Sequence, residues 1–355
     1  MKYTLFFLGL LSLLACEKPQ PQTQDFQIGP GYLVCNEGNF TFGNAALSFI
    51  SEDFTETKNQ VFTTSNGIPI GDVLQSSLIF NNELYLVVNN SGKIWVCDPN
   101  TLKIKRVIEG LNSPRYLIPL NQNELLISDL YAPYILVYNS ETNSISDSLM
   151  LGRSTETFLG FNAFVLSHSW AGDSAIHKIP RNTALPTEMT IVGPQPISMT
   201  KGPDSLVHIL CQGKTDGSNR IAGSLFSLDP NTMGIIDIFE FLNPQASPSQ
   251  IVFNSADGFY YLLSNTNPFN SSLPGGLFRF TDPATASQEP FISNAGKLFY
   301  HLYLDTEEQL IFLSDAKDYL QSGDLLVFDI TDGNPRLIHT KNCSVIPSFI
   351  TKKPD

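Results

Sequence analysis

The sequence predicts an all-β protein, a seven-bladed β-propeller with four antiparallel strands in each blade. Three observations predict this fold class. Apolar and polar residues alternate with the period of a β-strand, and long helical patterns are absent. A unit of four such strands recurs at intervals of 39 to 53 residues, the length of a propeller blade. The two ends of the chain hold complementary parts of one unit, as a closed ring requires.

The first residues have the features of a signal peptide. In MKYTLFFLGLLSLLAC, the apolar run from Leu5 to Leu14 is too short to span a bilayer and is followed by a small residue. The ending Leu-Leu-Ala-Cys resembles a bacterial lipobox, in which cleavage precedes the cysteine and its thiol is lipidated. We therefore expect a signal peptide over 1–15, lipidation of Cys16 and a Pro/Gln-rich tether over 16–28. An ordinary signal peptide with an incidental cysteine is the alternative.

The rest of the chain, 29–355, is expected to form the propeller. Each repeat has an apolar first strand, followed by a second strand and by a third that ends in a polar turn. In several units this turn reads Asp-Pro-Asn-Thr or Asp-Pro-Ala-Thr, and its recurrence at one register strengthens the repeat. The first strands are QSSLIF (75–80), RYLIPL (115–120), TFLGFN (157–162), PISMTK (196–201), SQIVFN (249–254), FYHLYL (299–304) and VIPSFI (345–350).

The ring is expected to close through the two chain ends. The segment GYLVCN (31–36) resembles a second strand, but no first strand precedes it. The segment VIPSFI (345–350) resembles a first strand, but nothing follows it. If the C-terminal strand joins the N-terminal blade, the seventh sheet is complete and no free sheet edge remains.

Composition limits the classes of partner. The formal net charge of −13 and the pI near 4.8 argue against a nucleic-acid partner, because phosphate binding needs a basic surface. An acidic chain also binds anionic lipid headgroups poorly, so we expect membrane contact only through the lipid anchor. Only 15% of residues are charged, while Asn, Ser, Thr and Gln are abundant, so the surface is expected to offer many uncharged hydrogen-bonding groups.

Four cysteines remain besides the one in the lipobox. Cys35, Cys97, Cys211 and Cys343 have neither CxxC spacing nor neighbouring histidines, which disfavours a zinc site. Cys343 directly precedes the closing first strand, and Cys35 lies near the end of its antiparallel neighbour. We therefore predict a Cys35–Cys343 disulfide, in an oxidising compartment. Two free buried thiols are the alternative.

The two faces of the predicted ring differ in the length of their connections. Connections between strands one and two, or three and four, are short turns, whereas those between strands two and three are long and irregular. Because binding residues concentrate on loops held by a rigid scaffold, we expect the ligand site on the long-loop face. The long connections include 36–45, 129–133, 168–174, 212–223, 264–276 and 314–324.

Aromatic rings on the long loops, with amides and carboxylates at the ends of the second strands, form the candidate site. Asp129 and Asp315 also fit as caps of local turns. Phe42 also fits as a ring packed under its own loop, and His168 as a hydrogen-bonded structural residue. The predicted ligand-binding residues are Asn36, Glu37, Phe40, Phe42, Asn89, Asp129, Tyr131, His168, Trp170, Gln212, Asn265, Phe269, Asp315 and Tyr319.

The sequence contains no catalytic constellation, and we predict no catalytic residue. It lacks a GxSxG nucleophile elbow, an HExxH zinc motif and a Gly-rich phosphate loop. A Ca²⁺-dependent hydrolase or lyase is the enzymatic alternative, because a hard cation in the central channel needs several oxygen ligands. Its ligands would be Glu37, Asp129, Asn265 and Asp315.

The segment NEGNFTFGNAALSFI (36–50) carries a family resemblance. Together with the lipobox, the tether and the repeats, it resembles the YncE-like propeller lipoproteins of Bacteroidota, which include cobalamin-binding BtuG-type proteins. The resemblance implies a monomeric outer-membrane lipoprotein at the cell surface that binds cobalamin or another corrinoid. It also implies delivery of the ligand to a TonB-dependent transporter and no catalytic cofactor. A ligand-free protein-interaction propeller is a further alternative. The matching residues are Asn36, Glu37, Gly38, Phe40, Gly43, Asn44, Leu47, Ser48 and Phe49.

Overall fold

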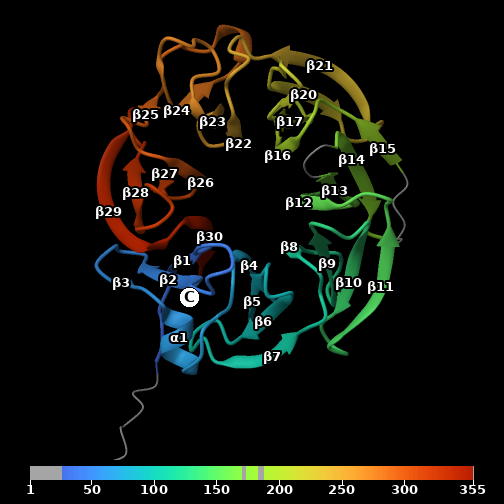
Figure 1. The fold of residues 1–355 in the computed structure, drawn as a ribbon, viewed down its shortest axis with the longest axis vertical. Coiled ribbons are helices and arrows are strands. Elements are labelled where there is room, and N and C mark those ends of the chain that lie inside the picture. The colour runs from blue at the N-terminus through green and yellow to red at the C-terminus, as the bar shows by residue number, and fades with distance from the viewer. Residues whose placement is uncertain (1–25, 170–172, 183–187, 355) are drawn as a thin grey trace, which may run out of the picture.

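The computed structural model describes residues 26–169, 173–182 and 188–354. In this part of the chain, four-stranded sheets are arranged as a ring around a central axis (Figure 1). The predicted signal peptide, the predicted lipidation site at Cys16, most of the predicted tether and Trp170 lie outside the described residues. No helix within these residues is long and apolar enough to cross a membrane.

Seven antiparallel four-stranded sheets form the blades, which confirms the predicted fold class. From the innermost strand outward, blade 1 consists of β30 (Pro347–Lys353), β1 (Gly31–Asn36), β2 (Ala46–Ser51) and β3 (Thr57–Lys58). Blade 2 consists of β4 (Leu74–Phe80), β5 (Glu83–Val88), β6 (Lys93–Cys97) and β7 (Ile104–Ile108). Blade 3 consists of β8 (Pro114–Pro119), β9 (Glu124–Asp129), β10 (Tyr134–Asn139) and β11 (Ser144–Met150).

The remaining blades repeat this order around the ring (Figure 1). Blade 4 consists of β12 (Thr155–Gly160), β13 (Phe164–Ser169), β14 (Ala175–Pro180) and β15 (Glu188–Ile191). Blade 5 consists of β16 (Pro196–Lys201), β17 (Val207–Cys211), β20 (Ser224–Asp229) and β21 (Gly234–Glu240). Blade 6 consists of β22 (Pro248–Asn254), β23 (Phe259–Thr266), β24 (Pro274–Phe280) and β25 (Ile292–Ser293). Blade 7 consists of β26 (Phe299–Asp305), β27 (Leu310–Asp315), β28 (Ser322–Asp329) and β29 (Arg336–Val345).

Short elements occupy three of the connections. Helix α1 (Val61–Asn66) lies between β3 and β4 and ends at Gly67, whose left-handed φ of 71° terminates it. A 3-10 helix, η1 (Pro283–Thr285), follows β24. The small hairpin of β18 (Lys214–Asp216) and β19 (Asn219–Ile221) interrupts blade 5 between β17 and β20.

The ring closes through the chain ends, as the sequence predicts. β30 pairs antiparallel with β1, with Val34 opposite Ile350. The closing strand begins at Pro347 rather than at Val345, because Val345 still belongs to β29 and Ile346 adopts a positive φ of 56°. This left-handed residue separates the outermost strand of blade 7 from the innermost strand of blade 1.

The hydrophobic core lies in separate clusters between neighbouring blades. Between blades 1 and 7, the buried ring of Tyr32 lies 4.6 Å from the ring of Phe312, and its hydroxyl donates to Asp305 at 2.8 Å. Similar clusters of buried side chains fill the other blade contacts. Burial of each large apolar side chain contributes roughly 1.5–3 kcal/mol, so the clusters hold the blades in fixed positions around the axis.

Every innermost strand has a β-bulge near its start. In all seven blades, the register between the innermost strand and its neighbour shifts at this point. A bulge takes one residue out of the ladder and re-aims its side chain. The second residues of the seven innermost strands, which lie at these bulges, are Ser348, Gln75, Arg115, Glu156, Ile197, Ser249 and Tyr300.

The predicted disulfide is absent, because Cys35 and Cys343 are free and buried. Cys343 lies on β29, which extends to Val345 as the outermost strand of blade 7. It packs with Tyr32 and its neighbours between blades 1 and 7. Cys35 faces the opposite side of β1, where its sulfur lies 3.4 Å from the hydroxyl of Ser77 in blade 2. The two thiols are therefore on different sides of one sheet, and the prediction was wrong.

Candidate functional site

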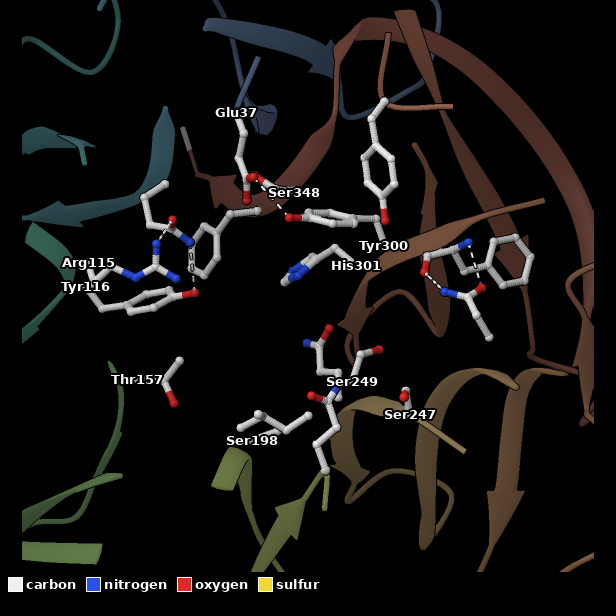
Figure 2. Close-up of a pocket in the computed structure, with 18 of the residues that line it drawn as sticks. Glu37, Arg115, Tyr116, Thr157, Ser198, Ser247, Ser249, Tyr300, His301 and Ser348 are labelled. Atoms are coloured by element: carbon white, nitrogen blue, oxygen red, sulfur yellow. Dashed lines mark hydrogen bonds between the residues drawn. The ribbon is translucent and has the colours of Figure 1, made fainter. Parts of the chain in front are cut away.

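A cavity of about 590 Å³ lies where the bulged ends of the innermost strands surround the axis of the ring (Figure 2). This volume is typical of small-molecule sites. The second residues of six innermost strands line it, together with side chains from the connections that follow the second strands. These second residues are Gln75, Arg115, Ile197, Ser249, Tyr300 and Ser348.

A buried ion pair forms one wall of the cavity. The Nε of Arg115 donates to both carboxylate oxygens of Glu156, at 2.9 and 3.0 Å, and its Nη1 donates to the side-chain oxygen of Gln75. Glu156 is almost completely buried, and burial raises its pKa although Arg115 favours the ionised form. Arg115 is the only lysine or arginine among the described residues that line the cavity. The Glu156 carboxylate compensates its charge.

Glu37 enters the cavity from the connection that follows β1 (Figure 2). Its backbone N–H donates to the carbonyl of Ile346 at 2.9 Å, which ties this connection to the start of the closing strand. The hydroxyl of Tyr300 donates to Glu37 Oε2 at 3.0 Å. Burial raises the pKa of Glu37, and the Tyr300 hydrogen bond and the charge of Arg115 oppose this shift only in part.

Aromatic rings make up much of the remaining wall. The ring of Phe349 lies 6.0 Å from that of Tyr116 and 5.6 Å from that of His301. Tyr300 meets Tyr319 edge-on at 5.9 Å. The imidazole of His301 points into the cavity (Figure 2), and burial lowers its pKa to about 4, so the ring is neutral at pH 7. The cavity therefore combines flat aromatic faces with many polar side chains, and its wall is about as polar as it is apolar.

Amide side chains at the ends of the second strands connect neighbouring blades. Each donates to the carbonyl of the first residue in the next innermost strand. Asn89 donates to Pro114 at 3.0 Å, and Gln212 donates to Pro248 at 3.3 Å. Asn265 donates to Phe299 at 2.6 Å and accepts from the N–H of the same residue at 3.0 Å. These amides therefore hold the ring together, and the Asn265 side chain uses both its donor and its acceptor in doing so.

The structure brings only part of the predicted site to the cavity. Glu37, Gln212, Asn265 and Tyr319 line it. The rings of three further candidates are exposed on loops rather than packed beneath them. Their exposed fractions are 65% for Phe40, 77% for Phe42 and 69% for Tyr131.

The other described candidates are buried and do not line the cavity. Asp129 and Asp315 cap their local turns: Asp129 accepts from the backbone N–H of Tyr131, and Asp315 from that of Lys317. Phe269 belongs to the hydrophobic core of blade 6. The remaining three are Asn36, Asn89 and His168, all buried among protein groups.

The four residues of the calcium alternative do not converge. Asp129 and Asp315 accept hydrogen bonds from local backbone N–H groups, and Asn265 bonds to the next blade. Among the described residues, no group of three or more His, Cys, Asp and Glu side chains is placed to hold a metal ion. The positions of these oxygens therefore give no support to the calcium alternative.

Sequence reasoning missed the residues that the innermost strands supply. The predicted site lay on the long loops, whereas Arg115, Tyr116, Tyr300 and His301 lie within innermost strands that the sequence marks only as scaffold. One sequence signal was available: near the start of the apolar first strand, six of the seven repeats have a polar or aromatic residue at the same position, and the exception is Ile197. Repetition at the innermost strand places them around one axis.

A second cavity, of about 520 Å³, lies between blades 5 and 6. His208 Nδ1 lies 3.2 Å from the hydroxyl of Ser227, and its Nε2 lies 3.5 Å from the carboxylate of Asp204. The Nε2 approach is an ion-pair distance, and no hydrogen bond satisfies this nitrogen. Burial lowers the pKa of His208, and Asp204 opposes that shift in part. The Ser227 hydroxyl, the neutral His208 ring and the Asp204 carboxylate thus lie in a row, with the histidine between the other two.

Comparisons with known proteins support the fold. Residues 30–162 match a protein family described as "Domain of unknown function (DUF5074)". No curated protein matches the chain. The family match over residues 30–162 covers the first blades and says nothing about a ligand.

Solved structures from distant proteins share the architecture. A quinoprotein alcohol dehydrogenase-like protein of Bacteroides thetaiotaomicron is 16% identical, with a TM-score of 0.66 over 92% of this chain and 79% of its own. A protein from Lactobacillus plantarum is 12% identical, with a TM-score of 0.63 over 91% and 99% of the two chains. A dihydro-heme d1 dehydrogenase is 10% identical, with a TM-score of 0.57 over 95% and 82%. At these identities the likeness concerns the propeller fold alone.

Proposed function

We propose that this chain is a lipid-anchored propeller at the cell surface that binds a small molecule in the 590 Å³ cavity at its axis. The observation that carries the proposal is the cavity itself. It collects side chains from the bulges of different blades, and it combines aromatic faces with Glu37 and Arg115. Polar side chains are expected along any solvated channel, so the observations that favour a ligand are the aromatic rings and the desolvated carboxylate of Glu37.

A corrinoid is the ligand class that we propose. A corrinoid is a broad, flat ring edged with amides, so it suits aromatic faces surrounded by few charges. The cavity supplies Tyr116, Tyr300 and Phe349, and the loop that carries Glu37 also exposes the rings of Phe40 and Phe42. The corrinoid would cover the mouth and insert its edge groups, since the cavity is smaller than the whole ligand.

Calorimetric titration with cyanocobalamin tests this proposal. We expect saturable binding that weakens when Tyr300 is replaced by Ala, because the ring and its hydroxyl both face the cavity. Phe259→Ala is the control, since its ring does not line the cavity and lies 4.5 Å from the Arg279 guanidinium. The absence of heat at micromolar protein would refute the corrinoid, and co-purification with a receptor without any ligand would favour a protein-interaction role.

The proposal also includes a lipid anchor on this chain and a transporter as its protein partner. Lipidation of Cys16 would place the propeller at the outer membrane, where a TonB-dependent transporter would accept the ligand. Metabolic labelling with a fatty-acid analogue should mark the full chain and fail to mark a Cys16→Ser variant. Pull-down from outer membranes should recover a transporter with the wild-type protein.

Ester hydrolysis is a second candidate function, favoured by Ser227, His208 and Asp204 in the second cavity. In this arrangement, Ser227 would be the nucleophile, His208 Nδ1 the base and Asp204 the orienting carboxylate. The candidate ranks second because Asp204 is about half exposed, so solvent screens its charge. Turnover of p-nitrophenyl acetate that Ser227→Ala abolishes would support it, and equal rates in both proteins would reject it.

A further inference from the structure

The charges that face the axial cavity are unequally matched. Arg115 is held by Glu156 and by Gln75, so its charge is compensated within the wall. Glu37 receives a hydrogen bond from the Tyr300 hydroxyl and a weaker one from the Ser348 side chain, and among the described residues it forms no direct ion pair. The cavity therefore presents one carboxylate that has no directly paired cation and whose charge the more distant Arg115 compensates only in part.

That carboxylate is held in place by its loop. Two backbone hydrogen bonds tie the loop to the closing segment: Glu37 N–H donates to Ile346 at 2.9 Å, and Gly38 N–H donates to Val345 at 3.0 Å. Gly38 has a left-handed φ of 71°, and a Cβ there would lie 2.6 Å from the side-chain oxygen of Asn44. The turn thus requires glycine, and it directs the preceding glutamate into the cavity.

The surroundings of Glu37 disfavour a negatively charged partner and favour a nitrogen donor. A buried carboxylate loses hydration that only hydrogen-bond donors or a positive charge can replace. The faces of Tyr300 and Tyr319, next to it in the cavity wall, also attract cations through their ring quadrupoles. A carboxylate on the ligand would meet repulsion there, because Arg115 is already engaged by Glu156.

We propose that Glu37 determines the specificity of the axial cavity by accepting a hydrogen bond from a ligand nitrogen, an ammonium or an amide N–H group, and by rejecting carboxylates. This inference rests on the proposed function, because it requires that the cavity holds a ligand. For a corrinoid, the recognised group is an amide at the edge of the ring.

Three probes of one shape test the selectivity: benzylamine, benzamide and benzoate, titrated at pH 7.5 with ligand-observed NMR. We expect the order benzylammonium, benzamide, benzoate, with benzoate at least about tenfold weaker than benzylammonium, the scale of one charge-assisted hydrogen bond. The wild-type protein alone decides this ranking, so the test does not depend on whether a variant folds.

A Glu37→Gln variant then identifies the residue responsible. It should lower the affinity for benzylammonium about 10-fold to 100-fold and bring benzoate close to benzamide. Glu307→Gln is the matched control, because the Glu307 side chain is 82% exposed and should leave all three affinities unchanged. The inference is overturned if benzoate binds as tightly as benzylammonium. It is also overturned if Glu37→Gln leaves the ratio of the benzylammonium and benzoate affinities unchanged.

Cyanocobalamin in the same assay separates this inference from the proposed ligand. If benzylammonium binds in a Glu37-dependent manner and cyanocobalamin does not, the corrinoid proposal fails and the inference on Glu37 stands. If cyanocobalamin binds wild type and Glu37→Gln equally, the inference fails and the corrinoid proposal stands. If no probe binds, both are refuted.

Discussion

Replacement of Arg115 by methionine tests the role of the buried ion pair in the cavity wall. Methionine keeps most of the volume of the arginine stem but leaves the Glu156 carboxylate without its partner. That carboxylate is only 5% exposed, and loss of one partner of such a pair destabilises proteins by about 3–5 kcal/mol. We therefore expect Arg115→Met to lower the free energy of unfolding at pH 7 by about 3 kcal/mol or more.

The loss should depend on pH in a defined direction. Burial already raises the pKa of Glu156 in the wild type, and removal of Arg115 takes away the charge that opposes this shift. A carboxyl group with a raised folded-state pKa destabilises the fold at high pH, where it is forced to ionise, and less at low pH, where it is protonated. The deficit of Arg115→Met should therefore shrink as the pH falls from 7 towards the ordinary glutamate value of 4.5.

Urea unfolding at pH 7 and pH 5 measures both effects. The double variant Arg115→Met/Glu156→Gln should recover much of the loss at pH 7, because it removes the uncompensated charge. Arg336→Met is the matched control, since Arg336 pairs with Asp329 at the surface and its side chain is 71% exposed; we expect a change below about 1 kcal/mol. The reasoning is refuted if Arg115→Met costs no more than this control, or if its deficit grows as the pH falls.

Three further predictions concern the ring, the thiols and the rim. Asn265→Ala should lower the free energy of unfolding by about 1–3 kcal/mol, seen as a lower thermal midpoint, because the backbone N–H and C=O of Phe299 both lose their hydrogen bonds to the Asn265 side chain. Mass spectrometry after unfolding and alkylation without reductant should find both Cys35 and Cys343 alkylated; a bridged peptide would contradict the structure. Phe42→Ser should change the unfolding free energy by less than about 0.5 kcal/mol while weakening cyanocobalamin binding, since the ring is 77% exposed; unchanged affinity would remove Phe42 from the site.

The fold could be predicted because it depends on a repeated pattern rather than on single contacts. Apolar first strands recur at blade-length intervals, and the two incomplete units at the chain ends leave one closure that removes free edges. The disulfide failed because it depended on one strand boundary. The sequence gives no sign that β29 runs on to Val345, and this extension moves Cys343 to the outermost strand of blade 7.

The site was only partly predictable, because the same residue types serve two purposes at the strand ends. Asn89 and Asn265 have the composition expected of a binding surface, but both bond to the start of the next blade. Arg115 and Tyr300 face the cavity because a bulge re-aims each of them, and a bulge leaves no reliable mark in the sequence. Glu37 was found because it lies in a long loop next to the closing strand.

A crystal structure grown with cyanocobalamin tests most directly whether the axial cavity is the binding site. We expect density over the mouth of the cavity, with amide groups of the ligand within hydrogen-bond distance of Glu37 and the corrin ring against Tyr300 or Phe349. Density in the cavity between blades 5 and 6 instead, or an empty axial cavity at saturating ligand, would contradict it.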